Sequence, residues 1–343
     1  MRLAELDFDL PERLIAQEPQ TQREGSRMLV VDRKAGEVSD HRFVEFPDFL
    51  RDGDLLVVNN TKVFPARLFG HSETGARIEI FLVREVGEVR WEALARPARR
   101  LKVGKRVLFG ENLSATVIEK LDDGKIVIAF ESVGPLDAVI DELGRTPLPP
   151  YIKREQDAID RDRERYQTVY AKNRGAIAAP TAGLHFTPEV FAEIAARGVE
   201  RAEITLHVGY GTFEPVRVDD LAEHRVMPER YEIDAETAEK LNRAKADGRR
   251  IVAVGTTTTR ALESNFGRLG RFEAVSSLAD LTITPGYTFG AVDALLTNFH
   301  LPQSSLLLLT SVFGGHELIM NAYRHAVAGE YRFYSYGDCM LIV

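Results

Sequence analysis

Arg250-Ile251-Val252-Ala253-Val254 is the stretch that decides the fold class, because its run of apolar residues predicts a strand buried on both faces. A helix is predicted over residues 235–246, directly before this strand, with Gly248 as its stop. Residues 203–208 predict another strand ahead of that helix. The order strand, helix, strand implies a parallel or mixed sheet with helices packed against it.

The same α/β pattern extends to both sides of this stretch. Residues 28–31 and 55–58 are strand-like apolar runs that we expect to join the sheet. Thr187 at the N-cap and Pro188 at the first helical position predict a helix that ends at Gly198. The sequence therefore predicts one large α/β domain with a mixed sheet.

A different pattern interrupts this domain between about residues 63 and 133. Six short β-rich runs alternate there with glycine-containing turns, which is typical of a small antiparallel β-barrel. The proline-rich stretch 147–150 predicts a stiff, extended linker after the barrel. We therefore predict a barrel domain over 63–149, inserted into a discontinuous α/β domain made of 1–62 and 150–343.

Composition limits the class of protein. The 343 residues are 44% hydrophobic and 28% charged, as in an ordinary soluble protein, and the single cysteine excludes an intramolecular disulfide and a multi-thiolate metal site. Glu5 and Asp7 stand where a secretory signal needs an apolar core, and the apolar run 306–309 is far shorter than a membrane span of about 20 residues. We expect a cytoplasmic protein without a membrane segment.

The net charge of −8 argues against general coating of nucleic acid, but one local basic patch stands out. Residues 96–106 contain no acid, so their cations repel one another unless they are solvated or face an anion. A solvated hairpin rim and a phosphate-binding surface are both possible from this pattern alone. The cations of this basic patch are Arg96, Arg99, Arg100, Lys102, Lys105 and Arg106.

Four further segments crowd polar side chains next to apolar runs, and together they predict one composite pocket. Residues 254–264 run from a strand through Gly255 into a threonine-rich helix start, where free N–H groups favour a carboxylate or a phosphate, although simple helix capping gives the same pattern. Gly209-Tyr210-Gly211 allows close backbone approach to a ligand, but Glu214 breaks a dinucleotide fingerprint, so a nicotinamide cofactor is rejected. The four segments are 179–187, 206–213, 254–260 and 296–305.

These segments, with several other blocks, resemble the S-adenosylmethionine:tRNA ribosyltransferase-isomerases of queuosine biosynthesis. The resemblance runs from Leu6 to Ile342. The other blocks are Ser26-Arg27-Met28-Leu29, Asn59-Asn60-Thr61-Lys62-Val63-Phe64-Pro65-Ala66-Arg67-Leu68, Pro147-Leu148-Pro149-Pro150-Tyr151-Ile152, Tyr166-Gln167-Thr168-Val169-Tyr170 and Tyr331-Arg332-Phe333-Tyr334-Ser335-Tyr336-Gly337-Asp338.

The resemblance implies a two-domain enzyme that uses S-adenosylmethionine as a consumed co-substrate and needs no other cofactor. Its ribosyl part would pass to 7-aminomethyl-7-deazaguanine at the wobble position of a tRNA, which gives epoxyqueuosine and releases adenine and methionine. For the basic patch it favours contact with tRNA phosphates. Absent heptads leave a monomer as the default expectation.

The resemblance also suggests roles for residues in the four segments. No His-x-x-His or His-Glu-x-x-His pair is present, so we expect no metal and assign proton transfer to imidazoles and a carboxylate. The predicted acid–base set is His207, His224, Glu229 and His300. The predicted substrate-binding set is Thr181, His185, Gly209, Gly211, Thr212, Gly255, Thr256, Thr257, Arg260 and Asn298.

Two positions depart from the family pattern. Met227 stands where a second histidine is common, and Asn60 stands where aspartate often follows Asn59. We therefore assign no essential charge to either position.

Two other functional classes fit the sequence less well. An S-adenosylmethionine-dependent RNA methyltransferase would need an early glycine-rich strand-to-helix loop and a following acid, which are missing. A non-catalytic RNA-binding protein would need strong basic character and stacking aromatic residues, whereas this chain is acidic overall.

Overall fold

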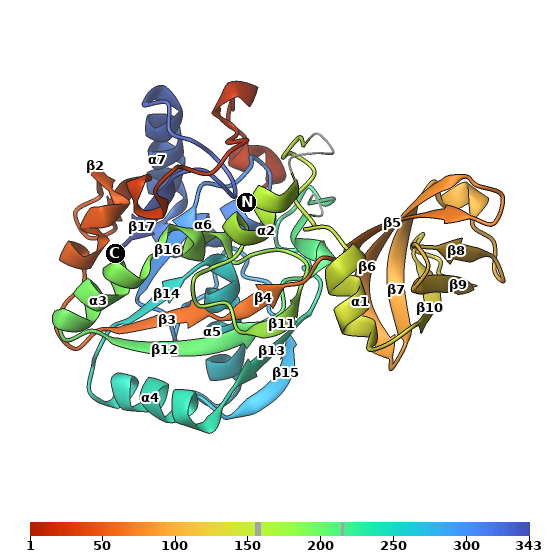
Figure 1. Ribbon diagram of the computed structural model, residues 1–343. Helices are drawn as coiled ribbons and strands as arrows, with labels where there is room; N and C mark the ends of the chain where they lie inside the picture. The colour runs from red at the N-terminus through yellow and green to blue at the C-terminus, as the bar shows by residue number, and fades with distance from the viewer. Residues whose placement is uncertain (155–158, 214–215) are drawn as a thin grey trace.

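The computed structural model describes residues 1–154, 159–213 and 216–343, apart from the side chains of residues 100, 159–161, 212 and 213. The chain forms a large α/β part and a smaller barrel that projects from one side of it (Figure 1). Both termini lie in the α/β part. The predicted combination of a mixed sheet with an antiparallel barrel is confirmed.

The α/β part is built on a nine-stranded sheet with the order β15-β13-β12-β3-β14-β16-β17-β1-β2. Its centre is parallel, because β12, β3, β14 and β16 all run in the same direction, whereas the remaining neighbours are antiparallel except for β1 and β17. The strands are β1 Arg27–Asp32, β2 Glu37–Arg42, β3 Leu55–Asn59, β12 Glu200–Leu206, β13 Glu229–Ile233, β14 Ile251–Val254, β15 Val275–Ala279, β16 Ala294–Asn298 and β17 Cys339–Ile342.

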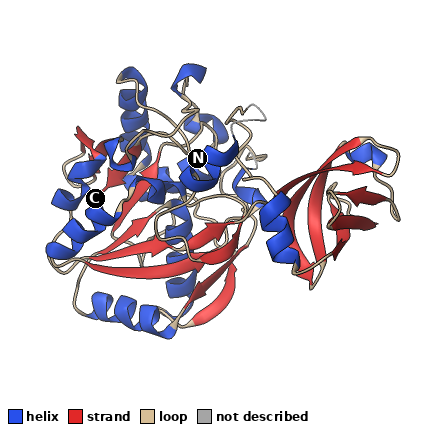
Figure 2. Cartoon of the chain, in the orientation of Figure 1, coloured by secondary structure: helices blue, strands red, loops and turns tan. Residues whose placement is uncertain are grey.

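Helices cover both faces of this sheet (Figure 2). Alternate residues of β3 show why: Leu55 and Val57 join one apolar core, and Leu56 and Val58 join the other. The α-helices of this part are α2 Ile159–Arg165, α3 Pro188–Ala196, α4 Ala235–Ala246, α5 Thr256–Leu269, α6 Ser305–Gly314 and α7 His316–Ala328. Its 3-10 helices are η1 Leu3–Leu6, η2 Glu12–Leu14, η3 Arg23–Gly25, η4 Phe43–Phe49, η6 Thr181–His185 and η7 Tyr210–Phe213.

The predicted helix starts are confirmed by their caps. The Thr187 hydroxyl accepts from the Val190 N–H at 3.3 Å, with Pro188 at the first position of α3. Helix α4 has the predicted bounds, with Asp234 as its cap. The strand predicted over 203–208 begins and ends earlier, at Glu200 and Leu206, so His207 follows β12 instead of lying in it.

The barrel is closed by six antiparallel strands and has an apolar core of its own around Trp91. Its elements are β5 Arg67–Ser72, β6 Arg77–Gly87, β7 Arg90–Arg96, η5 Ala98–Arg100, β8 Arg106–Leu108, β9 Leu113–Lys120, β10 Ile126–Ser132 and α1 Leu136–Leu143. Strand β4, Thr61–Val63, leads into it and pairs with β11, Asn173–Ala176. The division into domains at 62/63 and 149/150 stays a prediction.

Among the described residues, no helix combines the length and the apolar character that crossing a membrane requires.

Candidate functional site

The site lies where two neighbouring parallel strands end. Val254 of β14 pairs with Leu296 of β16, so the segments that follow, from Gly255 and from Thr297, leave the same edge of the sheet side by side. In open α/β sheets this edge is where ligands bind. Two of the four segments predicted from the sequence therefore meet at this edge, and residues 179–182 and Val208 from the other two segments line the same cavity.

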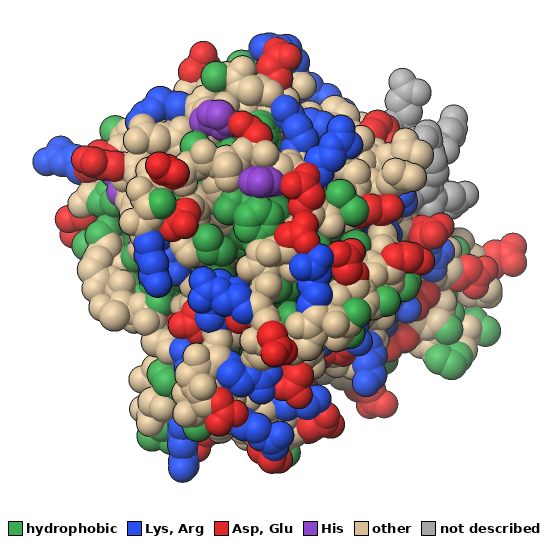
Figure 3. All heavy atoms as spheres, turned by 90° about the vertical axis from the view of Figure 1, so that its left-hand side faces the viewer, with side chains coloured by type: hydrophobic (Ala, Val, Ile, Leu, Met, Phe, Trp, Pro, Cys, Tyr) green, Lys and Arg blue, Asp and Glu red, His purple; other side chains and the backbone are tan. Residues whose placement is uncertain are grey.

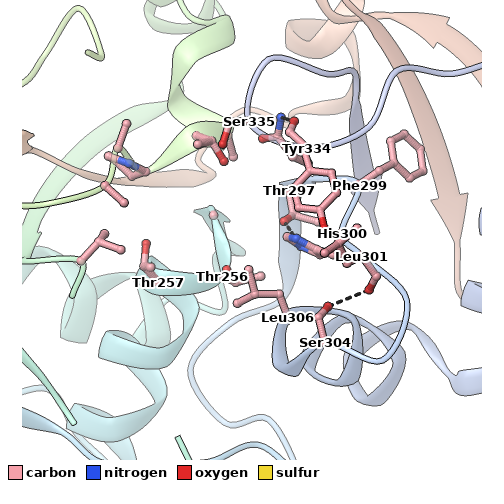
Figure 4. Close-up of a pocket in the computed structure, with 18 of the residues that line it drawn as sticks. Thr256, Thr257, Thr297, Phe299, His300, Leu301, Ser304, Leu306, Tyr334 and Ser335 are labelled. Carbon is pink, nitrogen blue, oxygen red and sulfur yellow. Dashed lines mark hydrogen bonds between the residues drawn. The ribbon is translucent and has the colours of Figure 1, made fainter. Parts of the chain in front are cut away.

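A cavity of about 520 Å³ opens at this edge, which is a size typical of small-molecule sites. Figure 4 shows its lining side chains converging from α5, from the β16–α6 connection and from the segment around Tyr334. The predicted residues that line it are Thr181, Gly255, Thr256, Thr257, Asn298 and His300. No Lys, Arg, Asp or Glu is among the described residues of its wall.

The amino end of α5 forms one wall of the cavity. Its first helical hydrogen bond runs from the Thr259 N–H to the Gly255 carbonyl, so the N–H groups of Thr256 to Thr258 precede the helical pattern. Gly255 has φ +92° and no side chain with which to cap them. The Thr257 Oγ1 is buried and has no hydrogen-bond partner. This wall therefore offers several donors without an acceptor.

Asn298 lines the cavity from the end of β16, and its amide has a fixed orientation. Its Nδ2 lies 3.0 Å from the Tyr334 carbonyl, which can only accept, so this amide atom must be the donor. The same Nδ2 lies 3.4 Å from His185 Nε2, and His185 Nδ1 lies 3.0 Å from Ser26 Oγ. Burial lowers the pKa of His185 to about 4, so the ring is neutral and its Nε2 can accept. The Asn298 Oδ1 is left without a partner.

A tyrosine-rich wall was missed by the assignment of roles from sequence. The rings of Tyr151 and Tyr334 are in contact, with centroids 3.9 Å apart and planes tilted by 41°, and the Tyr151 hydroxyl lies 2.6 Å from Ser335 Oγ. Tyr334 has φ +73°, which is unusual outside glycine, and its buried hydroxyl has no partner. These residues lie in blocks that resemble the family, and that was the only signal in the sequence that could have marked them.

His300 enters the cavity as a neutral ring. Its Nε2 lies 2.9 Å from Thr297 Oγ1, and burial lowers its pKa to about 3. The Tyr323 hydroxyl accepts from the backbone N–H of His300 at 3.0 Å and so holds the turn. At neutral pH this imidazole can accept a proton or share a hydrogen bond, but it does not carry the charge of an imidazolium acid.

A second, much smaller cavity of about 30 Å³ shares Ser305 and Leu306 with the first. Glu229 and Arg260 meet beside it in a buried ion pair of 2.7 Å, and the Gly209 N–H donates to the other Glu229 oxygen. Arg260 also donates to the carbonyls of Met227, Ala279 and Leu281. Arg260, predicted to bind substrate, therefore lies outside the lining of the main cavity and holds this cluster together.

His224 connects the two cavities. Its Nε2 lies 2.7 Å from Ser305 Oγ, and Ser305 lines both. Burial lowers the pKa of His224, so its neutral form is favoured. Met227 packs beside Gly211, where an added Cβ would lie 2.9 Å from the Met227 Cβ. The side chain at the departing position 227 therefore fills space next to the Gly209–Gly211 turn.

His207 lies outside the lining of both cavities. Its Nδ1 lies 2.8 Å from Thr61 Oγ1, and its ring covers Gly175, where an added Cβ would lie 2.7 Å from the ring. Gly209 is tied to Glu229, and the side chain of Thr212 lies outside the described residues. The described histidines, cysteine and acids form no group of three or more suited to a metal ion.

Asn60 is buried in a network beneath the sheet edge. Its Nδ2 donates to Glu203 at 3.1 Å, and its Oδ1 accepts from Asn173 and Thr205. An aspartate here would place a second carboxylate next to Glu203 and would remove the amide donor of this contact.

The basic patch surrounds η5 and the start of β8 on the barrel. Arg106 pairs with Glu131 and donates to Ser114. Among the described side chains of the patch, Arg96, Arg99, Lys102 and Lys105 are exposed and have no ion-pair partner, whereas the side chain of Arg100 lies outside the described part.

The whole chain is similar to known proteins. The family model described as queuosine biosynthesis protein matches residues 3–342. Relatives from Syntrophotalea carbinolica and Staphylococcus haemolyticus, both named S-adenosylmethionine:tRNA ribosyltransferase-isomerase, are each 49% identical over 345 residues and cover all of both chains. A crystal structure of S-adenosylmethionine tRNA ribosyltransferase from Thermotoga maritima is 38% identical, covers 99% of this chain and 100% of that one, and has a TM-score of 0.56. This chain therefore belongs to the queuosine biosynthesis protein family.

Proposed function

We propose that this chain transfers and isomerises the ribosyl moiety of S-adenosylmethionine onto 7-aminomethyl-7-deazaguanine at the wobble position of a tRNA. The product is epoxyqueuosine, and adenine and methionine leave. The observation that carries this function is the 49% identity over the full length to relatives that bear this enzyme name. The main cavity supports it, because its size and its unpartnered polar atoms suit a nucleoside with an amino-acid tail.

The reaction needs a base to remove the proton next to the sulfonium, an acid to help adenine leave, and donors for the oxygens of the opened sugar. His300 and Ser305 line the cavity, and His224 reaches it through Ser305 Oγ. Both rings favour the neutral form, which suits proton acceptance. We therefore narrow the acid–base set to His300 and the His224–Ser305 pair, in which the ring that takes up the proton as base becomes the imidazolium acid for the leaving adenine, while Glu229 organises the neighbouring turn.

The tyrosine-rich wall is the proposed surface for adenine. Tyr151 and Tyr334 present aromatic area, and the Tyr334 hydroxyl lacks a partner. Stacking on an aromatic ring is worth about 1–3 kcal/mol for a nucleic-acid base. In this proposal the face of the adenine ring packs on the tyrosine-rich wall until adenine leaves.

The proposed tRNA contact is the basic patch on the barrel. Figure 3 shows the face of the α/β part that is turned away from the barrel, where acidic and basic side chains alternate without a field of one sign. The exposed cations of the patch, in contrast, have no acid among them in the sequence. We propose a monomer that acts in the cytoplasm without a cofactor beyond the consumed S-adenosylmethionine.

The test is to incubate the purified protein with S-adenosylmethionine and a tRNA that carries 7-aminomethyl-7-deazaguanine, and to analyse nucleosides and small products by mass spectrometry. Epoxyqueuosine with free adenine and methionine in equal amounts is expected. S-adenosylhomocysteine would instead indicate methyl transfer, and unchanged tRNA would overturn the proposal. Alanine variants at His224, Ser305 and His300 follow, and a full single-turnover rate removes that residue from the acid–base set.

A further inference from the structure

The cavity end between β14 and β16 carries two buried polar atoms with opposite needs. Thr257 is 8% exposed, and its unpartnered Oγ1 can donate to an anion next to the free N–H groups of α5. Asn298 is 2% exposed, and its unpartnered Oδ1 can only accept. An unpaired buried polar group destabilises the protein unless a ligand completes it. Thr257 Oγ1 and Asn298 Oδ1 would therefore both be satisfied by one ligand that carries an anionic group and a hydrogen-bond donor close together.

We propose that this end of the cavity is a subsite for an α-amino-acid group, and that it binds the methionine end of S-adenosylmethionine. The carboxylate accepts from the amino end of α5 and from Thr257 Oγ1. The α-ammonium donates to Asn298 Oδ1. This assignment rests on the proposed function and deepens it.

The strand register supports the distance between the two contacts. Val254 pairs with Leu296, and the Gly255 N–H donates to the Leu296 carbonyl at 2.8 Å, so α5 begins beside the end of β16, which is Asn298. Neighbouring strands lie about 4.8 Å apart. The two charged groups of an α-amino acid are attached to one carbon, so a single ligand end can reach both strands.

The charge of the cavity distinguishes this ligand from a tRNA phosphate. No Lys or Arg is among the described residues of the cavity wall, and no acid is either. A phosphate diester is a lone anion and would bring an uncompensated charge to this end of the cavity, whereas the amino-acid group pairs its carboxylate with its own ammonium and leaves the sulfonium as the net charge of the ligand. The wall therefore fits the zwitterion better than a lone anion.

The orientation of Asn298 has its own support. The Tyr334 carbonyl and His185 Nε2 both take the Nδ2 side, and Ser26 holds the other nitrogen of His185. His185, predicted to bind substrate, contacts the Asn298 amide and is not among the residues that line the cavity, so it acts as a positioning residue. This arrangement leaves Oδ1 as the unpartnered acceptor of a residue that lines the cavity.

The first experiment needs no variant. Isothermal titration of the wild-type protein compares S-adenosylmethionine with its decarboxylated form and with 5′-methylthioadenosine, which lacks the whole amino-acid tail. Loss of one charge-assisted contact predicts weakening of roughly 10- to 100-fold for the decarboxylated form. Equal affinities for S-adenosylmethionine and its decarboxylated form would overturn the subsite.

A matched pair of variants then tests the hydroxyl. Thr257→Val removes an unpartnered group, whereas Thr258→Val removes a hydroxyl that already donates to the Val254 carbonyl at 2.6 Å. We expect Thr257→Val to weaken S-adenosylmethionine by about tenfold without loss of stability, and to leave the decarboxylated form unaffected. Thr258→Val should lower stability and leave both affinities unchanged. The opposite pattern would contradict the assignment.

The failure of this subsite is distinguishable from failure of the proposed function. If the wild-type protein forms epoxyqueuosine but does not discriminate against the decarboxylated form, the subsite is wrong and the function stands. If no ribosyl transfer occurs, the proposed function fails, even where S-adenosylmethionine binds with the expected discrimination.

Discussion

The main cavity and the Glu229–Arg260 cluster are neighbours, but they differ in how their polar groups are paired. Around the cavity, Thr257, Asn298 and Tyr334 each keep a buried polar atom without a partner. In the cluster, the Glu229 carboxylate and the Arg260 guanidinium bond each other and the surrounding backbone. Polar residues from the same predicted segments therefore fall into two sets. The cavity residues have polar atoms that a ligand can bind, and the cluster residues already bind each other and the backbone.

The largest expected effect on stability comes from breaking the Glu229–Arg260 ion pair. Glu229→Gln leaves the Arg260 charge buried without its partner, which destabilises the fold by about 3–5 kcal/mol. Denaturant unfolding of the variant and the wild-type protein measures this difference. The double variant Glu229→Gln, Arg260→Met should recover part of the loss, because no lone charge remains.

A full loss of S-adenosylmethionine binding in Glu229→Gln, with unchanged stability, would contradict the comparison. That result would mean that the Glu229 carboxylate binds the ligand and does not stabilise the fold.

The next effect concerns pH and the two neutral rings beside the main cavity. The pKa values of His185 and His300 are lowered to about 4 and about 3 by burial, whereas in the unfolded chain they return to about 6.5. The unfolded state therefore binds more protons below pH 6.5, and stability falls as the pH drops toward 4. The slope is roughly 1.4 kcal/mol per pH unit for each ring inside this window.

The free energy of unfolding at pH 7 and at pH 5 measures this slope, and His300→Gln should reduce it. An unchanged slope in that variant would mean that the ring is already charged in the folded protein.

The smallest expected effect is on tRNA binding, and it compares paired with unpaired cations on the surface of the barrel. Lys102 and Lys105 are exposed without an ion-pair partner among the described side chains, whereas Arg106 is paired with Glu131. Replacing both lysines by Gln should weaken tRNA binding by about tenfold and lower its salt dependence by about two released ions. Arg106→Gln is the control and should change tRNA binding less.

Fluorescence titration with tRNA at several salt concentrations gives both numbers. Equal effects of the paired and unpaired cations would remove the distinction on this surface.

The fold was predictable because its signals are local. The apolar run at 251–254, the cap at Thr187 and the glycine-separated strands of the barrel each depend on neighbours in the chain. The end of β12 was not predictable from local signals, because pairing with β3 and β13 decides where the strand stops. His207 lies beyond that end.

The site was predictable in its segments but not in its pairings. The sequence marked Thr257, Asn298 and His300, which share one cavity. It could not reveal that the Arg260 side chain contacts Glu229, because these residues are 31 positions apart and come together only in the folded chain. The tyrosine-rich wall escaped assignment because Tyr151 and Tyr334 come together from distant segments.

The most direct measurement is the rise in melting temperature caused by S-adenosylmethionine in two double variants. At about 100 times its dissociation constant, a ligand stabilises the folded state by about 2.7 kcal/mol. Glu229→Gln, Arg260→Met should melt lower but keep this ligand-induced rise at the wild-type size. Thr257→Val, Asn298→Ala should lose most of it at the same ligand concentration. A rise lost in the first variant and kept in the second would contradict the division between a fold-holding cluster and a ligand-binding cavity.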